Sequence, residues 1–140
     1  MPAADVVIGM INVLRTGQDL YVRNYESCLG FYSNKLQLSI HFANEELTCY
    51  DLYGTYLMVE REDRTEYLEL PADPLKTFTC LRLNVADVKA AAATTTARGI
   101  DVDYQEHDWG TVAKFKDPDG NVIAFKDETG FLKQMEEYLG

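Results

Sequence analysis

The sequence of 140 residues contains no long hydrophobic run, few cysteines and fewer bases than acids. Its longest wholly apolar stretches are a few residues, so we expect neither a membrane-spanning segment nor a signal-peptide core. Thirteen lysines and arginines against 23 acids leave a formal net charge of −10, which disfavours binding to nucleic acids. No two of the three cysteines are spaced as Cys-x-x-Cys, which favours reduced thiols in the cytoplasm over a disulfide framework or a zinc knuckle.

Catalytic signatures are also scarce. The sequence has no phosphate-binding loop, no dinucleotide-binding fingerprint and no Gly-x-Ser-x-Gly motif. Its only histidines are His41 and His107, which we interpret as surface or rim residues, although either could act as a base if buried beside a carboxylate. The composition, 46% hydrophobic and 26% charged, excludes a disordered chain, and the length predicts a single domain over residues 1–140.

The order of predicted strands and helices repeats along the chain. The first module, at about residues 6–62, is predicted to contain a buried apolar strand at 6–14, a helix at 21–36 with Asp19 as its N-cap, and strands at 38–42, 47–52 and 55–61. A charged linker at 63–76 contains Pro71 and Pro74. The second module, at about 77–127, is predicted to contain a strand at 77–85, a helix at 86–98 ended by Gly99, and strands at 100–104, 110–116 and 121–126.

This duplication predicts an α+β fold made of two βαβββ modules. In its register Met58 corresponds to Ala124, and Asn12 corresponds to Cys80. A terminal helix at 128–139 is predicted because its apolar residues recur at helical spacing, which leaves an apolar face that needs a partner surface.

Several segments carry a resemblance to a known family. They are the Phe31-Tyr32 pair with Leu36 and Leu38, the Val85-Ala-Asp87-Val88 and Ala97-Arg-Gly99-Ile100 segments, and Gly110-Thr111 with Asp117-Pro-Asp-Gly-Asn-Val122. With the duplicated order, residues 7–127 resemble the glyoxalase/bleomycin resistance protein/dioxygenase superfamily, also called the vicinal oxygen chelate fold. Cys80-Leu-Arg-Leu83 and Trp109-Gly-Thr111 are most similar to the bleomycin-resistance binding proteins. Gln37 departs from the pattern, since the family usually has Gly there.

The resemblance implies curved mixed sheets that form a cup, usually completed in a homodimer. It also implies where a metal would be held, because enzymes of the superfamily bind a divalent cation through His, Gln or Glu side chains on the first and last strands of each module. The corresponding positions here are Asn12 (or Ile11), Met58, Cys80 and Ala124. These side chains suit a hard cation poorly, so we expect no metal and no cofactor. Glu60, two residues beyond Met58, could serve as a displaced ligand.

Strand parity separates two faces in each module. One phase is apolar and is predicted to lie under the helices; it contains Leu57, Val59, Leu81, Leu83, Val85, Ile123 and Phe125. The opposite phase is mixed and contains Tyr56, Met58, Glu60, Cys80, Arg82, Asn84, Val122, Ala124 and Lys126. The mixed face suits a ligand with apolar and charged parts, although the same pattern is typical of the solvated side of an antiparallel sheet. Trp109 is either a core residue or an aromatic platform at the mouth of the cup.

Three function classes follow from these observations. We favour a cytoplasmic protein without a catalytic metal that binds a small amphipathic molecule at a homodimer interface, as antibiotic-resistance binding proteins do; a cationic ligand is compatible with the acidic chain. The candidate ligand-binding residues are Trp109, Arg82, Tyr56, Met58, Glu60, Cys80, Ala124 and Asn12. The alternative is a metal-dependent lyase or isomerase of the lactoylglutathione lyase type, or a dioxygenase, with relocated ligands and Glu60 moving the proton. The third is an interaction module that uses the terminal helix.

Overall fold

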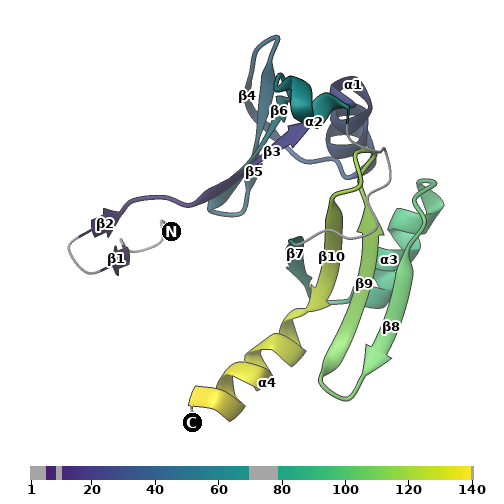
Figure 1. The fold of residues 1–140 in the computed structure, drawn as a ribbon. Helices are drawn as coiled ribbons and strands as arrows, with labels where there is room; N and C mark the ends of the chain where they lie inside the picture. Colours follow the sequence, from purple (N-terminus) through teal and green to yellow (C-terminus); the bar gives the residue numbers. More distant parts are fainter. Residues whose placement is uncertain (1–5, 9–10, 70–78, 140) are drawn as a thin grey trace. The chain divides into compact units, whose positions relative to one another are not determined.

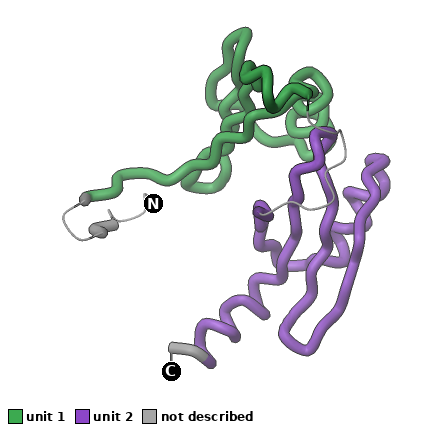
Figure 2. Tube along the Cα trace, viewed as in Figure 1, with its two compact units in different colours: residues 1–70 green, residues 71–140 purple. Residues whose placement is uncertain are grey.

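A computed structural model describes residues 6–8, 11–69 and 79–139 of the chain. The backbone contacts divide the chain into two compact units, residues 1–70 and residues 71–140 (Figure 2). The boundary falls inside the predicted linker, and each unit contains one four-stranded mixed sheet. In the described part of the chain, no helix is long and apolar enough to cross a membrane.

Unit 1 is built around the sheet β3-β6-β5-β4 (Figure 1). Its strands are β3 (Gly17–Val22), β4 (Ile40–Ala43), β5 (Leu47–Leu52) and β6 (Thr55–Arg61). β3 pairs with β6 in parallel, and the other neighbours are antiparallel. Its helices are α1 (Tyr25–Leu29), which continues as the π-helix η1 (Gly30–Lys35), and the short α2 (Thr65–Leu68). A separate two-stranded sheet joins β1 (Val6–Ile8) to β2 (Ile11–Val13).

The core of unit 1 lies between the sheet and α1–η1. Its fully buried apolar side chains include Cys28, Tyr32, Tyr50, Leu57 and Val59. The hydroxyls that enter this core find partners, because Tyr50 is 2.8 Å from the Ser33 hydroxyl and Tyr25 is 3.0 Å from that of Thr48. One face of the sheet is therefore covered by the helix, and the buried hydroxyls on that face are hydrogen-bonded.

Unit 2 repeats the arrangement as the sheet β7-β10-β9-β8. Its strands are β7 (Cys80–Val85), β8 (Asp103–His107), β9 (Gly110–Lys116) and β10 (Val122–Asp127). β7 pairs with β10 in parallel. α3 (Val88–Ala97) packs on β9 and β10, and its first turn is capped by the Asp87 carboxylate, which accepts a hydrogen bond from the Ala90 N–H. The predicted α+β fold with duplicated mixed sheets is confirmed.

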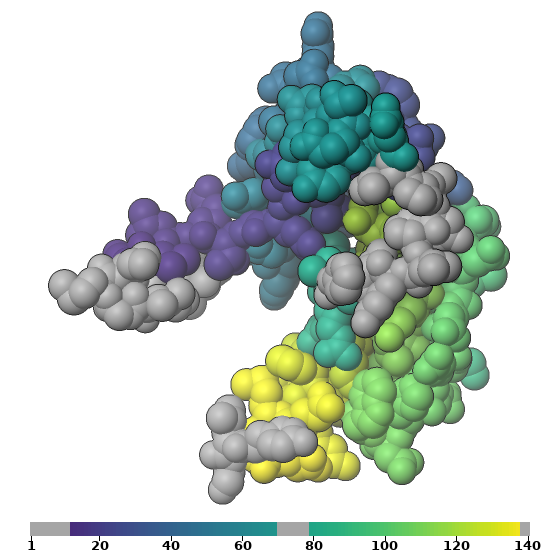
Figure 3. Space-filling model, in the orientation of Figure 1, coloured from purple at the N-terminus to yellow at the C-terminus, as the bar shows by residue number. Residues whose placement is uncertain are grey.

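The predicted C-terminal helix is also present, as α4 (Glu128–Leu139). It contacts β9 and β10. The helix is yellow in Figure 3. Its side chains Phe131, Leu132 and Met135 are exposed.

The first strand of unit 1 corrects the sequence prediction. The strand that pairs with β6 is Gly17–Val22, whereas the described residues of the apolar segment 6–14 form the separate antiparallel pair of β1 and β2. Asp19 is consequently a strand residue opposite Met58 and not a helix cap. The helix begins at Tyr25, after Asn24, whose side chain makes no capping hydrogen bond. The parallel pairing with β6 outweighs the low strand propensity of Gly, Gln and Asp.

Other boundaries differ by a few residues. The strand predicted at 100–104 is observed at Asp103–His107, and α2 lies inside the predicted linker. Residues 70–76 of that linker, and 77–78 of the next predicted strand, lie outside the described residues. Gly99 has the positive φ (+85°) expected of a residue that ends a helix. Gln37 also has a positive φ, +57°, so it adopts the conformation that glycine, usual there in the family, takes without strain.

Candidate functional site

The sheet of unit 1 has an open face on the side opposite α1–η1. Alternation along β3 and β6 places Asp19 and Tyr21 on this face with Tyr56, Met58 and Glu60. The three β6 residues are half-buried, whereas Leu57 and Val59, which point to the helix side, are fully buried. The mixed phase predicted from the sequence is thus a distinct face of the sheet.

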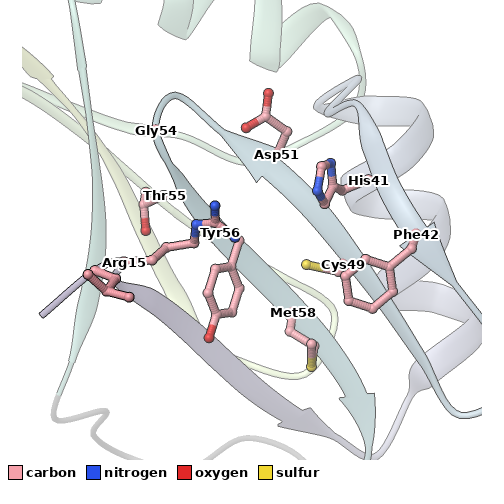
Figure 4. A pocket seen from close by; sticks show the side chains of 10 residues that line it. Arg15, His41, Phe42, Cys49, Asp51, Gly54, Thr55, Tyr56 and Met58 are labelled. Atoms are coloured by element: carbon pink, nitrogen blue, oxygen red, sulfur yellow. The ribbon is translucent and has the colours of Figure 1, made fainter. Parts of the chain in front are cut away.

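A pocket with a volume of about 530 Å³ lies on this open face (Figure 4). The rings of Tyr56 and Phe42 stand at its sides, and the side chains of Cys49 and Met58 lie between them. Cys49 and Met58 form the floor of the pocket. The strand register explains their position beside Phe42, because Met58, Cys49 and Phe42 are paired in one row across β6, β5 and β4. The remaining lining residues are Leu14, Arg15, His41, Asp51, Gly54 and Thr55.

The Tyr56 ring owes its position to Gly17. These two residues are paired across β3 and β6, and a Cβ built on Gly17 would lie 2.1 Å from Cζ of Tyr56. No other residue type could occupy position 17 with the ring where it is. Gly17 therefore lets the ring rest on the backbone of β3, where it forms one wall of the pocket.

A pair of carboxyl groups adjoins the pocket wall. Asp19 is paired with Met58, and Glu60 lies two residues further along β6. Burial, a hydrogen bond with Asp19 and the charges of Asp19, Asp63 and Glu46 raise the pKa of Glu60. The same Asp19 and Glu60 charges raise the pKa of the Tyr21 hydroxyl. The negative charges of Asp19 and Glu60 repel each other. A positively charged group of a ligand would relieve this repulsion in the same way as a proton does.

The thiol of Cys49 in the pocket floor is not activated. Its side chain is buried, with 2% exposure, and burial together with the charge of Asp19 raises its pKa. A nucleophilic thiolate needs the opposite environment. The sulfur atoms of Cys49 and Met58 therefore offer a polarisable contact surface, which favours aromatic groups.

Comparison with known proteins identifies the family. The model of the glyoxalase/bleomycin resistance protein/dioxygenase superfamily matches residues 10–125. The chain belongs to this superfamily. No curated protein matches the sequence.

Solved structures of the superfamily share the fold. A lactoylglutathione lyase from Agrobacterium tumefaciens is 16% identical, with a TM-score of 0.64 over 81% of this chain and 92% of that one. TnmS3, an antibiotic binding protein from Streptomyces sp. CB03234, is 25% identical, with a TM-score of 0.63 over 81% and 93% of the two chains. A glyoxalase/bleomycin resistance protein from the same organism is 27% identical, with a TM-score of 0.60 over 80% and 98%.

The residues at the superfamily's metal positions do not fit a hard divalent cation. Cys80 begins β7 and pairs with Val122, and the equivalent first residue of β3 is Gly17, which pairs with Tyr56. The predicted Asn12 is therefore the wrong residue: it lies in β2, outside the four-stranded sheet. Gly17 and Ala124 have no donor atom, and the corresponding Met58 offers only a thioether. Among the described residues, no three His, Cys, Asp or Glu side chains are grouped to hold a metal.

Trp109 lies in the β8–β9 turn of unit 2, with 44% exposure. The His107 ring stacks on it at 4.5 Å and 9°, and Nζ of Lys126 lies 4.6 Å from its ring centroid. Lys126 is fully buried and also donates to the Trp109 carbonyl at 3.4 Å. Trp109 thus already has aromatic and cationic partners within unit 2.

The structure brings the predicted site residues together in two groups. Tyr56, Met58 and Glu60 share the open face of unit 1, and Arg82, Cys80 and Ala124 share that of unit 2. Sequence reasoning missed Arg15, Phe42, Cys49 and Asp51, and it placed His41 only at a rim, whereas all five line the pocket. The alternation of Leu47, Cys49 and Asp51 could have identified two of them, since this phase of β5 faces the same way as Met58.

Proposed function

We propose that this superfamily member binds a small amphipathic molecule, with an aromatic part and a positively charged group, in the pocket of unit 1. The pocket itself carries the proposal, because its volume and mostly apolar lining are typical of small-molecule sites. The rings of Tyr56 and Phe42 provide stacking surfaces for the aromatic part. The Asp19–Glu60 pair beside Met58 provides negative charge for the cationic group.

Two further observations support binding without metal chemistry. Sequestration of a ligand requires affinity alone, so Gly17, Met58 and Ala124 can occupy the family's metal positions without loss of this function. The antibiotic-binding relative is 25% identical over most of both chains. A homodimer and a cytoplasmic location stay predictions, and sedimentation velocity tests the first of them.

Calorimetric titration with bleomycin, a cationic drug, tests the proposal. We expect a dissociation constant in the micromolar range and a loss of roughly tenfold or more in Tyr56→Ala, because an aromatic contact and its buried area are removed. Tyr53→Ala is the matched control, since Tyr53 is fully exposed at the tip of the β5–β6 hairpin. Phe42→Ala, at a half-exposed residue, gives a second measurement if Tyr56→Ala folds poorly.

The charge requirement has its own test. Asp19→Asn should weaken the binding of bleomycin, the cationic probe, several-fold. The affinity for naphthalenesulfonate, an anionic aromatic probe, should stay equal or rise. Absence of binding heat with both probes at tens of micromolar, or equal losses in Tyr53→Ala and Tyr56→Ala, would overturn the proposal.

The raised pKa of Glu60 supports the enzyme alternative. A lyase of the lactoylglutathione lyase type needs a general base, and a carboxyl group with a raised pKa suits that role. This candidate predicts stoichiometric nickel, zinc, cobalt or manganese in the purified protein. It also predicts turnover of the methylglyoxal–glutathione adduct that is lost in Glu60→Gln. Elemental analysis separates the two functions in one measurement, since the binding protein needs no metal.

A further inference from the structure

The open faces of the two sheets carry opposite charges at equivalent positions. In unit 1 the row across the sheet reads Asp19, Met58 and Cys49, from β3 to β6 to β5. The equivalent row of unit 2 reads Arg82, Ala124 and Lys114, from β7 to β10 to β9. The next row repeats the inversion, with Glu60 on β6 and Lys126 on β10. In a chain of net charge −10, this concentration of bases on one sheet face is a local exception.

The small side chain of Ala124 separates the two exposed cations. Neighbouring strands are about 4.8 Å apart, so the Cα atoms of Arg82 and Lys114 lie roughly 10 Å from each other across Ala124. Both side chains are long enough for their charged ends to converge over the alanine methyl group. Because β10 contributes only a methyl group at this position, no larger side chain of that strand stands between Arg82 and Lys114.

The thiol of Cys80 lies on the same face of the sheet as both cations. Cys80 is exposed and lies two residues before Arg82 on the same face. Burial, the larger effect, raises the pKa of the thiol, while the positive charges of Lys114 and Arg82 both act to lower it. Two cations on different strands therefore act on one exposed atom.

Two carboxylates close to this face in the strand register accept hydrogen bonds from amide side chains. Asp103, opposite Lys114 on β8, accepts a hydrogen bond from Nε2 of Gln105 at 2.9 Å. Glu128 accepts from Nδ2 of Asn84, the next residue on the face after Arg82, at 3.0 Å. Within the described residues, neither Arg82 nor Lys114 forms an ion pair. In the described part of the chain, no carboxylate therefore lies within ion-pair distance of either cation.

We propose that Arg82 and Lys114 form a binding site for a small anionic group, a carboxylate or a phosphate, over Ala124 and beside the thiol of Cys80. The guanidinium of Arg82 can donate two parallel hydrogen bonds to such a group, and the ammonium of Lys114 supplies a second charge from the opposite side. The site lies wholly in unit 2 and does not depend on the pocket of unit 1.

Alkylation of Cys80 in the full-length protein tests this site, because Cys28 and Cys49 are buried and Cys80 is exposed. The rates with the anionic reagent iodoacetate and the neutral reagent iodoacetamide are measured at one pH by peptide mass spectrometry. Their ratio removes the effect of the thiolate fraction. Each cation should raise the ratio of the iodoacetate rate to the iodoacetamide rate about threefold, if its charge lies roughly 6 Å from the reagent's carboxylate in water. Both cations together should raise this ratio about tenfold. We expect this ratio to fall by that factor in the Arg82→Gln/Lys114→Gln variant.

Lys89→Gln is the matched control, since it removes one charge from the exposed surface of α3 and should leave the ratio unchanged. At constant ionic strength, phosphate or acetate should also protect Cys80 from iodoacetamide in the wild type and not in the double variant. Stronger protection by one of the two anions identifies the source of the anionic group. An unchanged ratio in the double variant, or no protection by either anion, would overturn the proposal.

Discussion

Asp127 is the residue of unit 2 whose replacement we expect to cost most stability among the exposed or half-buried polar groups. Its carboxylate accepts hydrogen bonds from the N–H of Thr111 and the N–H of Gly130, each at 2.7 Å. It also pairs with Nζ of Lys126 at 3.3 Å. One side chain thus joins β9, β10 and the first turn of α4, and it neutralises a lysine that has no solvent exposure.

The expected cost of Asp127→Ala follows from these contacts. Loss of a helix cap costs about 1 kcal/mol, and leaving a buried charge without its partner costs about 3–5 kcal/mol. Lys126 keeps its contacts with the Trp109 ring and carbonyl, so we expect the lower end of the second range and a total cost of about 4 kcal/mol. Asp127→Asn keeps one side-chain oxygen that can accept a hydrogen bond. Its cost in stability should therefore be about half that of Asp127→Ala.

Urea unfolding followed by circular dichroism and by Trp109 fluorescence measures these costs. Asp108→Asn, an exposed change in the adjacent turn, is the control and should change stability by about 0.5 kcal/mol or less. The double variant Lys126→Met/Asp127→Ala should lose less stability than Asp127→Ala alone, because no buried charge is left unpaired. A cost of Asp127→Ala below about 1 kcal/mol, or a double variant less stable than Asp127→Ala, would refute the reasoning.

The pH dependence gives an independent check. Burial acts to raise the pKa of Asp127, but the hydrogen bonds from Thr111, Gly130 and Lys126 outweigh it and the pKa is lowered. The stabilisation is therefore complete above the pKa of an unfolded aspartate, about 3.9, and is lost as the pH falls through the lower value of the folded state. The stability difference between wild type and Asp127→Asn should be constant from pH 5 to 8 and should shrink below about pH 4.

Three further predictions concern unit 1. Gln37→Gly should raise the free energy of unfolding by up to about 1 kcal/mol, because φ at this residue is +57°. The urea midpoint should rise accordingly, and an unchanged or lower midpoint would contradict this. Gly17→Ala should displace the Tyr56 ring and weaken bleomycin binding in calorimetry, since the new Cβ would meet the ring; unchanged affinity would show that the ring position is not required. Glu60→Gln should stabilise the protein at pH 7, because burial and Asp19 raise the pKa of Glu60 and disfavour its ionised form. That gain should vanish at low pH, where the wild-type carboxyl is protonated.

The sequence predicted those elements whose signals are local. The predicted bounds of Thr55–Arg61 and Gly110–Lys116 agree with the observed strands, because each contains β-branched and aromatic residues next to a strong turn signal. Gly17–Val22 was missed because its Gly, Gln and Asp have low strand propensity, and the strand exists through its pairing with β6.

The pocket depended on that missed strand. Once Gly17 and Asp19 are assigned to β3, Arg15 lies just before the sheet and reaches the pocket beside Tyr56. Without this assignment the sequence could identify Tyr56 and Met58 but not the residues that complete the lining. A parallel pairing between strands far apart in sequence leaves no local signal, so this part of the site required the structure.

The parallel strands at the sheet edges also have a consequence for synthesis of the protein. β3 has its partner only once Thr55–Arg61 has left the ribosome, and β7 must wait in the same way for Val122–Asp127. Each nascent unit therefore exposes an unsatisfied strand until its last strand emerges, and such edges are prone to misassembly. Because the first unit ends at Leu70, it can complete its sheet while translation of the second continues, so the two halves become competent to fold one after the other.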